Sequence, residues 1–147
     1  MSLSNNRIAL FIHTLAGGGS IRVFLNLADG LQKAGYQIDL LVKKASGEYL
    51  TQVPFGVNLI NLNAPRMAAT LPGVIRYLYA QRPRALLSGV DLPNLIAIIA
   101  KKVSGSKTKV IVTVHGVVSQ YGRYFLPSRT LERKFMRLIY PGSDQIV

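Results

Sequence analysis

The sequence predicts a doubly wound α/β domain with a mostly parallel sheet, and three features indicate this fold class. Residues 7–13 are too uniformly apolar for a half-solvated strand, so we expect a strand covered on both faces, as in a parallel sheet. Glycines 17–19 follow, and then an amphipathic helix pattern that stops before Gly35. A second apolar run at 37–42 completes a β-α-β unit, and further apolar runs alternate with helical patterns along the chain.

The first expected helix has a cap, an apolar face and a stop signal. Ser20 can cap its N-terminus, because a serine hydroxyl accepts hydrogen bonds from the first helical amides. Four apolar residues recur at near-helical spacing and predict one core-facing stripe: Val23, Leu27, Leu31 and Ala34. Gly35 then stands where a left-handed residue commonly ends a helix.

The rest of the chain continues the alternation of strands and helices. Strands are expected at 57–62, 85–90 and 109–114, with a final apolar segment at 143–147. Helices are expected at 71–81, 92–103 and 128–140, with a loop or short helix at 43–55. Asp91 precedes the second of these helices, and we favour a capping role for it over contact with a ligand.

Gly17, Gly18 and Gly19 lie between the end of the first strand and the start of the first helix. A helix N-terminus has unpaired amides and the positive end of the helix dipole, which together favour an anion. Glycines there let the backbone come close to a phosphate or a sugar. The same spacing also suits a tight turn that needs positive φ angles, so from spacing alone both interpretations stay open.

Another glycine follows the fifth expected strand, in the pair His115-Gly116. Ligands of an open α/β sheet bind outside the carboxyl ends of its strands, so this pair would share an edge with the glycines at 17–19. We therefore expect His115 to have a functional role. His13 has a similar location without an adjacent glycine, and for His13 we expect a structural role.

Composition limits the class of protein. The chain has 147 residues, the length of one domain, and 49% of them are hydrophobic. The absence of cysteine excludes disulfides and thiolate chemistry, and two histidines argue against a histidine-rich metal site. No apolar run approaches the roughly 18 residues of a membrane span, and no signal-peptide pattern occurs, so we expect a cytoplasmic protein.

The net charge of +12 is concentrated in the second half of the chain. Residues 1–73 hold six Lys and Arg against three Asp and Glu, whereas residues 74–147 hold twelve against three. Arg129, Arg133 and Arg137 stand four residues apart on the last expected helix and would form one basic face. That face would either meet an anionic membrane surface or phosphorylated lipid acceptor, with the protein peripheral to the membrane, or be solvated.

Four motifs occur in an order that is informative. They are Leu15-Ala16-Gly17-Gly18-Gly19-Ser20-Ile21-Arg22, then Leu25-Asn26-Leu27-Ala28 with Gly35-Tyr36-Gln37-Ile38, then Val112-Thr113-Val114-His115-Gly116, and finally Ser143-Asp144-Gln145-Ile146-Val147. This series resembles the N-terminal domain of family 4 glycosyltransferases, the retaining enzymes of GT-B architecture. The resemblance covers nearly the whole chain. Ile21 replaces a frequent glutamate and Tyr36 a frequent histidine, so roles tied to those side chains do not carry over.

The resemblance implies that residues 1–147 are a single Rossmann-like, acceptor-side domain, the N-terminal half of a GT-B enzyme. Such a hexosyltransferase-like enzyme moves a sugar from a nucleotide-sugar donor to an acceptor, and a lipid-linked or cell-envelope glycan is one acceptor class. His115 would be catalytic, and Gly17, Gly18, Gly19 and Gly116 would bind donor or acceptor. The resemblance implies no metal and no cofactor beyond the nucleotide-sugar co-substrate.

The last motif resembles the segment before the linker to a second domain. A C-terminal domain that holds the nucleotide sugar would then be absent from these 147 residues, so we expect this chain to be a fragment that is inactive alone.

Two other classes of protein compete with this interpretation. A dinucleotide-binding dehydrogenase would need glycine where Arg22 stands and an acidic residue where Lys43 stands, so we set it aside. A non-enzymatic nucleic-acid-binding or anion-binding module suits the charge, but no known nucleic-acid-binding motif accompanies the basic residues.

Overall fold

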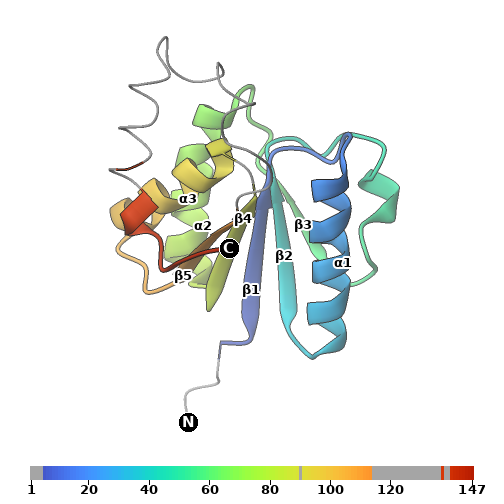
Figure 1. Cartoon of the computed structure of the whole chain (residues 1–147), viewed down its shortest axis with the longest axis horizontal. Coiled ribbons are helices and arrows are strands. Elements are labelled where there is room, and N and C mark those ends of the chain that lie inside the picture. Colours follow the sequence, from blue (N-terminus) through green and yellow to red (C-terminus); the bar gives the residue numbers. More distant parts are fainter. Residues whose placement is uncertain (1–4, 90, 114–136, 138–139) are drawn as a thin grey trace.

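The structure is a computed structural model that describes residues 5–89, 91–113, 137 and 140–147. Within this part of the chain, six strands form one sheet in the order β3-β2-β1-β4-β5-β6 (Figure 1). The strands are β1 (Arg7–Ile12), β2 (Gln37–Val42), β3 (Asn58–Asn61), β4 (Ala85–Gly89), β5 (Lys109–Thr113) and β6 (Gln145–Ile146). Every neighbouring pair is parallel. The strand order reverses at β1, which confirms the predicted doubly wound class.

Helices cover both faces of the sheet (Figure 1). Helix α1 (Gly19–Lys33) lies on one face, and α2 (Leu71–Gln81) and α3 (Asp91–Ser104) lie together on the other. Three short 3₁₀ helices complete the described elements: η1 (Leu50–Gln52), η2 (Met67–Thr70) and η3 (Tyr140–Gly142). None of the described helices is long and apolar enough to cross a membrane.

The two layers of helices explain why β1 is apolar from Ile8 to Ile12. In β1, Ala9 and Phe11 belong to the core under α2 and α3, whereas Ile8, Leu10 and Ile12 belong to the core under α1. All five residues are buried. Because alternate side chains of a strand face opposite sides, a strand covered by helices on both sides needs apolar residues at every position.

The start of α1 differs from the sequence expectation. The helix begins at Gly19 with Gly18 as its N-cap and has no side-chain cap bond, so the prediction that Ser20 caps it is wrong. Glycine can occupy this N-cap without strain at a φ of 94°, and Ser20 is therefore already a helical residue. The end of α1 agrees with the prediction, because Gly35 is left-handed at a φ of 97°.

The buried face of α1 is also rotated relative to the predicted stripe. Its buried residues are Ile21, Phe24, Leu25 and Ala28. Leu27 and Leu31 are only partly buried at the edge of this face, and Val23 is 51% exposed. Both sets have helical spacing, and the choice between them depends on the angle at which the helix leaves the glycine loop.

The remaining predicted elements agree with the structure to within two residues at most ends, but three predictions need comment. Of the helix expected at 128–140, the structure describes only Arg137, which is helical, and Tyr140, which belongs to η3 instead. The segment expected at 143–147 contains a strand of only two residues, β6. Asp91 is the first residue of α3, and its capping role lies outside the described side chains.

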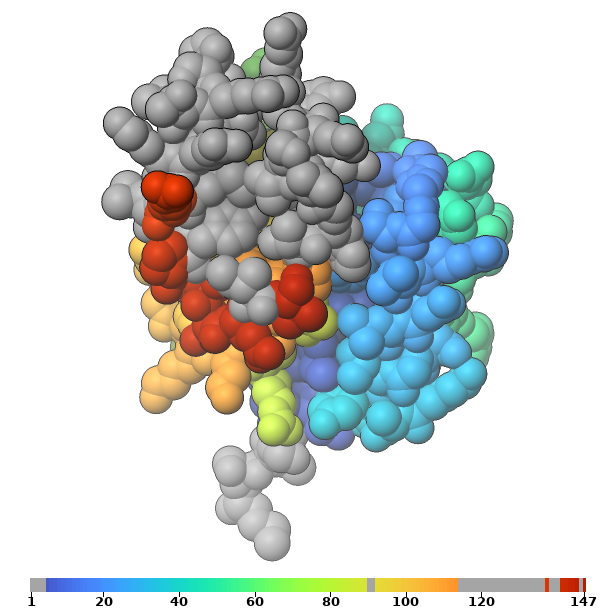
Figure 2. Space-filling view, viewed as in Figure 1, coloured from blue at the N-terminus to red at the C-terminus, as the bar shows by residue number. Residues whose placement is uncertain are grey.

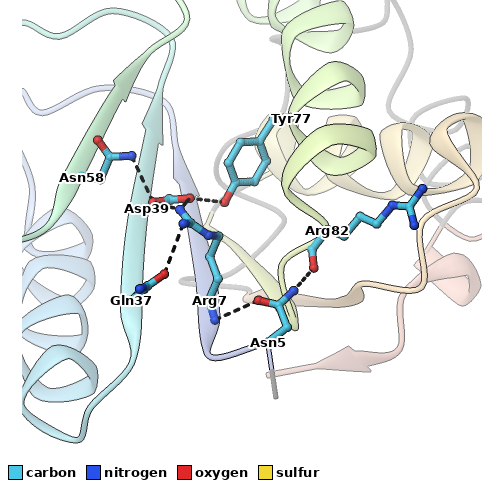
Figure 3. Close-up of polar contacts among 7 residues, drawn as sticks. All are labelled: Asn5, Arg7, Gln37, Asp39, Asn58, Tyr77 and Arg82. Atoms are coloured by element: carbon cyan, nitrogen blue, oxygen red, sulfur yellow. Dashed lines mark hydrogen bonds and ion pairs between the residues drawn. The ribbon is translucent and has the colours of Figure 1, made fainter. Parts of the chain in front are cut away.

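A buried carboxylate joins three strands and a helix (Figure 3). Asp39 on β2 is 1% exposed and accepts hydrogen bonds from Arg7 Nη1, at 2.9 and 2.7 Å to its two oxygens. It also accepts bonds from Asn58 Nδ2 on β3 at 3.1 Å and from Tyr77 Oη on α2 at 2.6 Å. Burial raises the pKa of Tyr77 well above its usual value, and the bond to Asp39 raises it further, so the phenol stays a donor.

Asp144 ties β6 to the rest of the fold. Its carboxylate accepts hydrogen bonds from Lys101 on α3 and from the Val110 amide of β5, the latter at 2.8 Å. The Lys101 bond, followed by the Val110 bond, lowers the pKa of Asp144. Figure 2 shows the C-terminal segment in red against the orange surface around the end of α3.

We predict that Asp39→Ala destabilises the fold by about 3 kcal/mol, because the partly buried Arg7 would lose its counter-charge and the buried Tyr77 hydroxyl would lose its acceptor. The matched control is Asp29→Ala, which breaks the solvent-exposed pair of Asp29 with Lys33 and should cost at most about 0.5 kcal/mol. Urea unfolding followed by circular dichroism measures both. Equal losses of stability in the two variants would contradict the central role of Asp39.

Candidate functional site

The site is built where β1 ends and α1 begins, at the carboxyl edge of the sheet. Gly17 and Gly18 have φ angles of 65° and 94°, a left-handed conformation that residues with a Cβ rarely adopt. They turn the chain so that the first amides of α1 face the end of the sheet. The first turn of α1 contains no acidic residue, so no side-chain charge of its own opposes an anion at this helix end. The predicted strand-to-helix glycine turn is therefore present.

A second segment, between β2 and η1, supports the glycine loop from outside. The Tyr49 amide donates to Leu15 O at 2.9 Å, and the Thr14 hydroxyl donates to Ser46 O at 3.4 Å. Gly47, with a φ of 126°, packs so closely that any Cβ would collide with the backbone of Leu15. The start of the glycine loop is thus held in place by the segment of residues 46–49.

One loop amide already contacts a negative group. Gly17 N donates to Glu48 Oε1 at 3.3 Å, and Glu48 is an exposed residue. This bond shows that the Gly17 amide is free of the helix and can donate to an oxygen of a negatively charged group. A phosphate or sugar oxygen would have to displace Glu48 from Gly17, which an exposed side chain with a weak bond permits.

A cavity of about 250 Å³ opens beside the loop at the carboxyl ends of β1 and β4. Its lining combines loop, helix and strand residues: Ile12, His13, Thr14, Ala16, Gly17, Ser20, Ile21, Phe24 and Gly89. Gly89 ends β4, and a Cβ there would lie 2.5 Å from Cε2 of Phe24. The ring of Phe24 can therefore occupy its position beside β4 only because residue 89 has no side chain.

His13 is the titratable residue in this lining. Partial burial lowers the pKa of His13, and the nearby positive charge of Lys43 lowers it further. The imidazole is therefore neutral at pH 7, with one nitrogen able to donate and the other able to accept a hydrogen bond. Such a group suits a sugar hydroxyl better than it suits a phosphate.

The structure brings together only part of the predicted site. Gly17 lines the cavity, and Gly18 and Gly19 lie directly beside it at the N-terminus of α1. His115 and Gly116 lie outside the described residues, as do Arg129 and Arg133. Arg137 is described and is exposed. The ligand-binding and catalytic roles of these residues stay predictions.

Sequence reasoning missed three residues of the cavity. His13, for which the sequence predicts a structural role, accepts a backbone hydrogen bond from the Lys43 amide and is also one of the residues that line the cavity. The position of His13 directly after a buried strand was the signal for a site residue. Phe24 and Gly89 had no such signal, because they are far apart in sequence and only the packing of α1 on β4 joins them. Among the described residues, no group of three or more His, Asp and Glu is placed to hold a metal ion.

The fold and the cavity define a class: a doubly wound α/β domain with a ligand-sized hollow beside a glycine loop at the carboxyl edge of its sheet. The sequence matches the model of Glycosyltransferase Family 4 over residues 17–147, so the chain belongs to that family, as the motifs predicted. No curated protein sequence matches the chain.

Solved structures share the fold at low sequence identity. A glycosyltransferase from Rickettsia africae ESF-5 has a TM-score of 0.70 and 14% identity, over 97% of this chain and 37% of that one. The apo form of the lipopolysaccharide outer core galactosyltransferase WaaB has a TM-score of 0.58 and 14% identity, over 72% of this chain and 32% of that one. A Listeria monocytogenes protein assigned as a UDP-N-acetylglucosamine 2-epimerase has a TM-score of 0.62 and 13% identity, over 95% of this chain and 38% of that one. The chain thus spans less than two fifths of each of these three proteins.

We predict that Gly47→Ala loosens the glycine loop, because the new methyl group would collide with the backbone of Leu15. The matched control is Gly35→Ala, which also has a positive φ but meets no atom within 4 Å. Conformational strain should cost Gly35→Ala about 1 kcal/mol, and Gly47→Ala should lose at least about 1 kcal/mol more from the collision. Amide hydrogen exchange should rise at residues 15–18 in Gly47→Ala alone; equal exchange in both variants would show that the loop does not depend on this contact.

The lowered pKa of His13 predicts how its protonation depends on pH. His13 should titrate below the ordinary value of 6.5, and Lys43→Met should raise the pKa only part of the way back, because burial is the larger cause. Since folding favours the neutral ring, the contribution of His13 to stability is complete above pH 6.5 and declines as the pH falls through the folded-state pKa. NMR titration measures this, with the signal assigned by its loss in His13→Gln. A pKa at or above 6.5 would contradict the environment described for the ring.

Proposed function

We propose that this chain is the N-terminal, acceptor-side domain of a retaining GT-B glycosyltransferase, which transfers a sugar from a nucleotide-sugar donor to an acceptor. The observation that carries the proposal is the family match over residues 17–147, which begins within the glycine loop. The cavity of about 250 Å³ beside that loop supports it, because a hollow of this size suits one sugar ring rather than a whole nucleotide sugar.

The loop would contribute backbone amides to this reaction. Amides at Gly17, Gly18 and Gly19, at the positive end of α1, would bind the sugar or the diphosphate edge of the donor. His13 would offer its neutral imidazole to a sugar hydroxyl. His115, with Gly116 beside it, would contact the transferred sugar and stabilise charge that develops at its anomeric carbon. In this proposal helix ends and basic side chains offset the diphosphate charge, so no metal or other cofactor takes part.

A second domain would complete the enzyme. The compared structures are more than twice as long as this chain, and donor and acceptor must be held together for transfer to occur. The chain alone would therefore be inactive, and the rest of the nucleotide site would come from a C-terminal domain.

The acceptor class that we propose is a lipid-linked or cell-envelope glycan. The lipopolysaccharide named in the description of WaaB supports this proposal. Arg129, Arg133 and Arg137 would then contact an anionic membrane surface or a phosphorylated lipid acceptor.

Gly19→Val tests the role of the loop without disturbing the fold. Gly19 has no positive φ and a Cβ there meets no atom within 4 Å, so the variant should remain about as stable as the wild type. The new side chain would cover the first amides of α1 and should lower sugar transfer by the complete enzyme at least about tenfold, equivalent to one lost bond to a charged oxygen. The matched control is Gly30→Val, which lies on the same helix, also meets no atom within 4 Å, and should leave transfer unchanged.

The assay uses a panel of nucleotide sugars, and mass spectrometry of the products distinguishes transfer from epimerisation. Transfer attaches the sugar to the acceptor and releases the nucleoside diphosphate, whereas an epimerase leaves an altered sugar on the nucleotide or releases it as a free sugar. Transfer lost only in Gly19→Val supports the proposal. Full transfer by both variants contradicts the role of the loop, and epimerised product contradicts the proposed activity.

A further inference from the structure

A larger hollow lies at the opposite edge of the sheet from the glycine loop. It has a volume of about 850 Å³ and is lined by the residues that directly precede β4 and β5, together with the end of α2. Two short basic motifs form its walls, Arg82-Pro83-Arg84 before β4 and Lys107-Thr108-Lys109 at the start of β5. We call this hollow the amino-edge groove, because it lies at the amino ends of these two strands.

The charge of the amino-edge groove is unbalanced. Its four basic residues are all exposed, and its lining contains no aspartate or glutamate from the described part of the chain. The ion pairs found among the described residues use other basic side chains: Arg7, Lys33 and Lys101. Like charges gathered in one hollow repel one another, and the groove therefore has a positive potential that an anion would relieve.

Arg82 is held in an unusual conformation at the mouth of the groove. It ends α2 with a left-handed φ of 45°, where glycine is the favoured residue, and its carbonyl accepts a hydrogen bond from Asn5. Its Nε donates to Tyr79 O at 3.3 Å, and its guanidinium lies 5.8 Å from the centre of the Tyr79 ring. Figure 3 shows the side chain extended away from Asp39. These contacts position the guanidinium before any ligand arrives.

Hydroxyl groups fix the second wall, which lies beside the first. Ser106 Oγ and Thr108 Oγ1 lie 2.7 Å apart, and the Thr108 amide donates to Ser106 Oγ at 3.2 Å. Thr108 Oγ1 donates to Pro83 O at 2.7 Å, which joins the two basic motifs directly. Two residues of the Lys107-Thr108-Lys109 motif are therefore tied to the Arg82-Pro83-Arg84 motif, since the Lys109 amide also donates to Arg84 O at 3.2 Å. The spacing between the two walls is set by these bonds.

We propose that the amino-edge groove binds a soluble ligand that carries at least two phosphoryl groups. Two walls with two cations each match two anionic groups of one ligand, and guanidinium and ammonium groups are the usual partners of phosphoryl oxygens. The cations line a concave surface, which a small oligophosphate can enter and a flat lipid bilayer cannot follow. The volume lies within the range of small-molecule sites. This site is separate from the glycine-loop cavity, because the sheet itself lies between the two edges.

Inorganic tripolyphosphate is the probe, titrated calorimetrically into the protein at low and moderate salt. Arg84→Gln with Lys107→Gln removes one cation from each wall and should weaken binding at least about tenfold. The matched control, Arg66→Gln with Arg76→Gln, removes the same charge from exposed positions outside the groove and should weaken binding less than about twofold. Circular dichroism melting checks that both double variants stay folded.

Each outcome decides the matter. Binding that is lost in the groove variant and kept in the control supports the proposal. No binding of tripolyphosphate, or equal weakening in both variants, overturns it in favour of a general effect of net charge. A parallel sedimentation with vesicles of phosphatidylglycerol or phosphatidylcholine tests whether the groove binds phospholipid headgroups instead of a soluble phosphate. Vesicle binding that needs Arg84 and Lys107, without tripolyphosphate binding, would also overturn the proposal.

Discussion

The hydrogen-bonded carboxylate of Asp39 is the constraint on which the arrangement of the sheet depends. Its partners come from β1, β3 and α2, so these elements are placed relative to β2 by one side chain. A buried ion pair stabilises a fold little compared with apolar packing, but it strongly disfavours arrangements that leave its charges unpaired. Sliding β1 or β3 by one residue would turn Arg7 or Asn58 to the other face and leave the carboxylate buried without these partners.

Correct register in turn decides what lies at each edge of the sheet. Parallel strands in register bring all their carboxyl ends to one side, where the glycine loop, Phe24 and Gly89 surround a cavity. The same register brings the amino ends of β4 and β5 together on the other side, where two basic motifs face one groove. One sheet thus presents a neutral, sugar-sized hollow at one edge and a strongly positive hollow at the other.

The two hollows differ in how they could attract ligands. In the proposed function, the carboxyl-edge cavity would use backbone amides and a neutral imidazole, which select by direction and distance more than by charge. The amino-edge groove uses exposed cations, whose attraction acts over roughly a Debye length and weakens with salt. A protein of net charge +12 would attract many anions, but only a fixed geometry such as the bonded walls of the groove would discriminate among them.

Local patterns predicted the elements well because they depend on neighbours in sequence. Apolar runs covered on both faces identified β1 and β2, and Gly35 identified the end of α1. The start of α1 was less predictable, because Ser20 and Gly18 are both acceptable caps and the choice depends on the path of the loop. The predicted Gly17 lies in the cavity, whereas Phe24 and Gly89 could not be found from spacing, since they meet only when α1 packs against β4.

The sequence by itself determined the class of fold, the order of its elements and the family, because periodicity, glycine positions and motif order are properties of short segments. Only the tertiary structure decided which side of α1 is buried, that His13 lines a cavity, and that Asp39 has partners on three other elements. It also brought together Arg82-Pro83-Arg84 and Lys107-Thr108-Lys109, which lie more than twenty residues apart in the chain. The physical reason is that burial, charge balance and cavity shape depend on the distances between segments, and those distances exist only after the chain has folded.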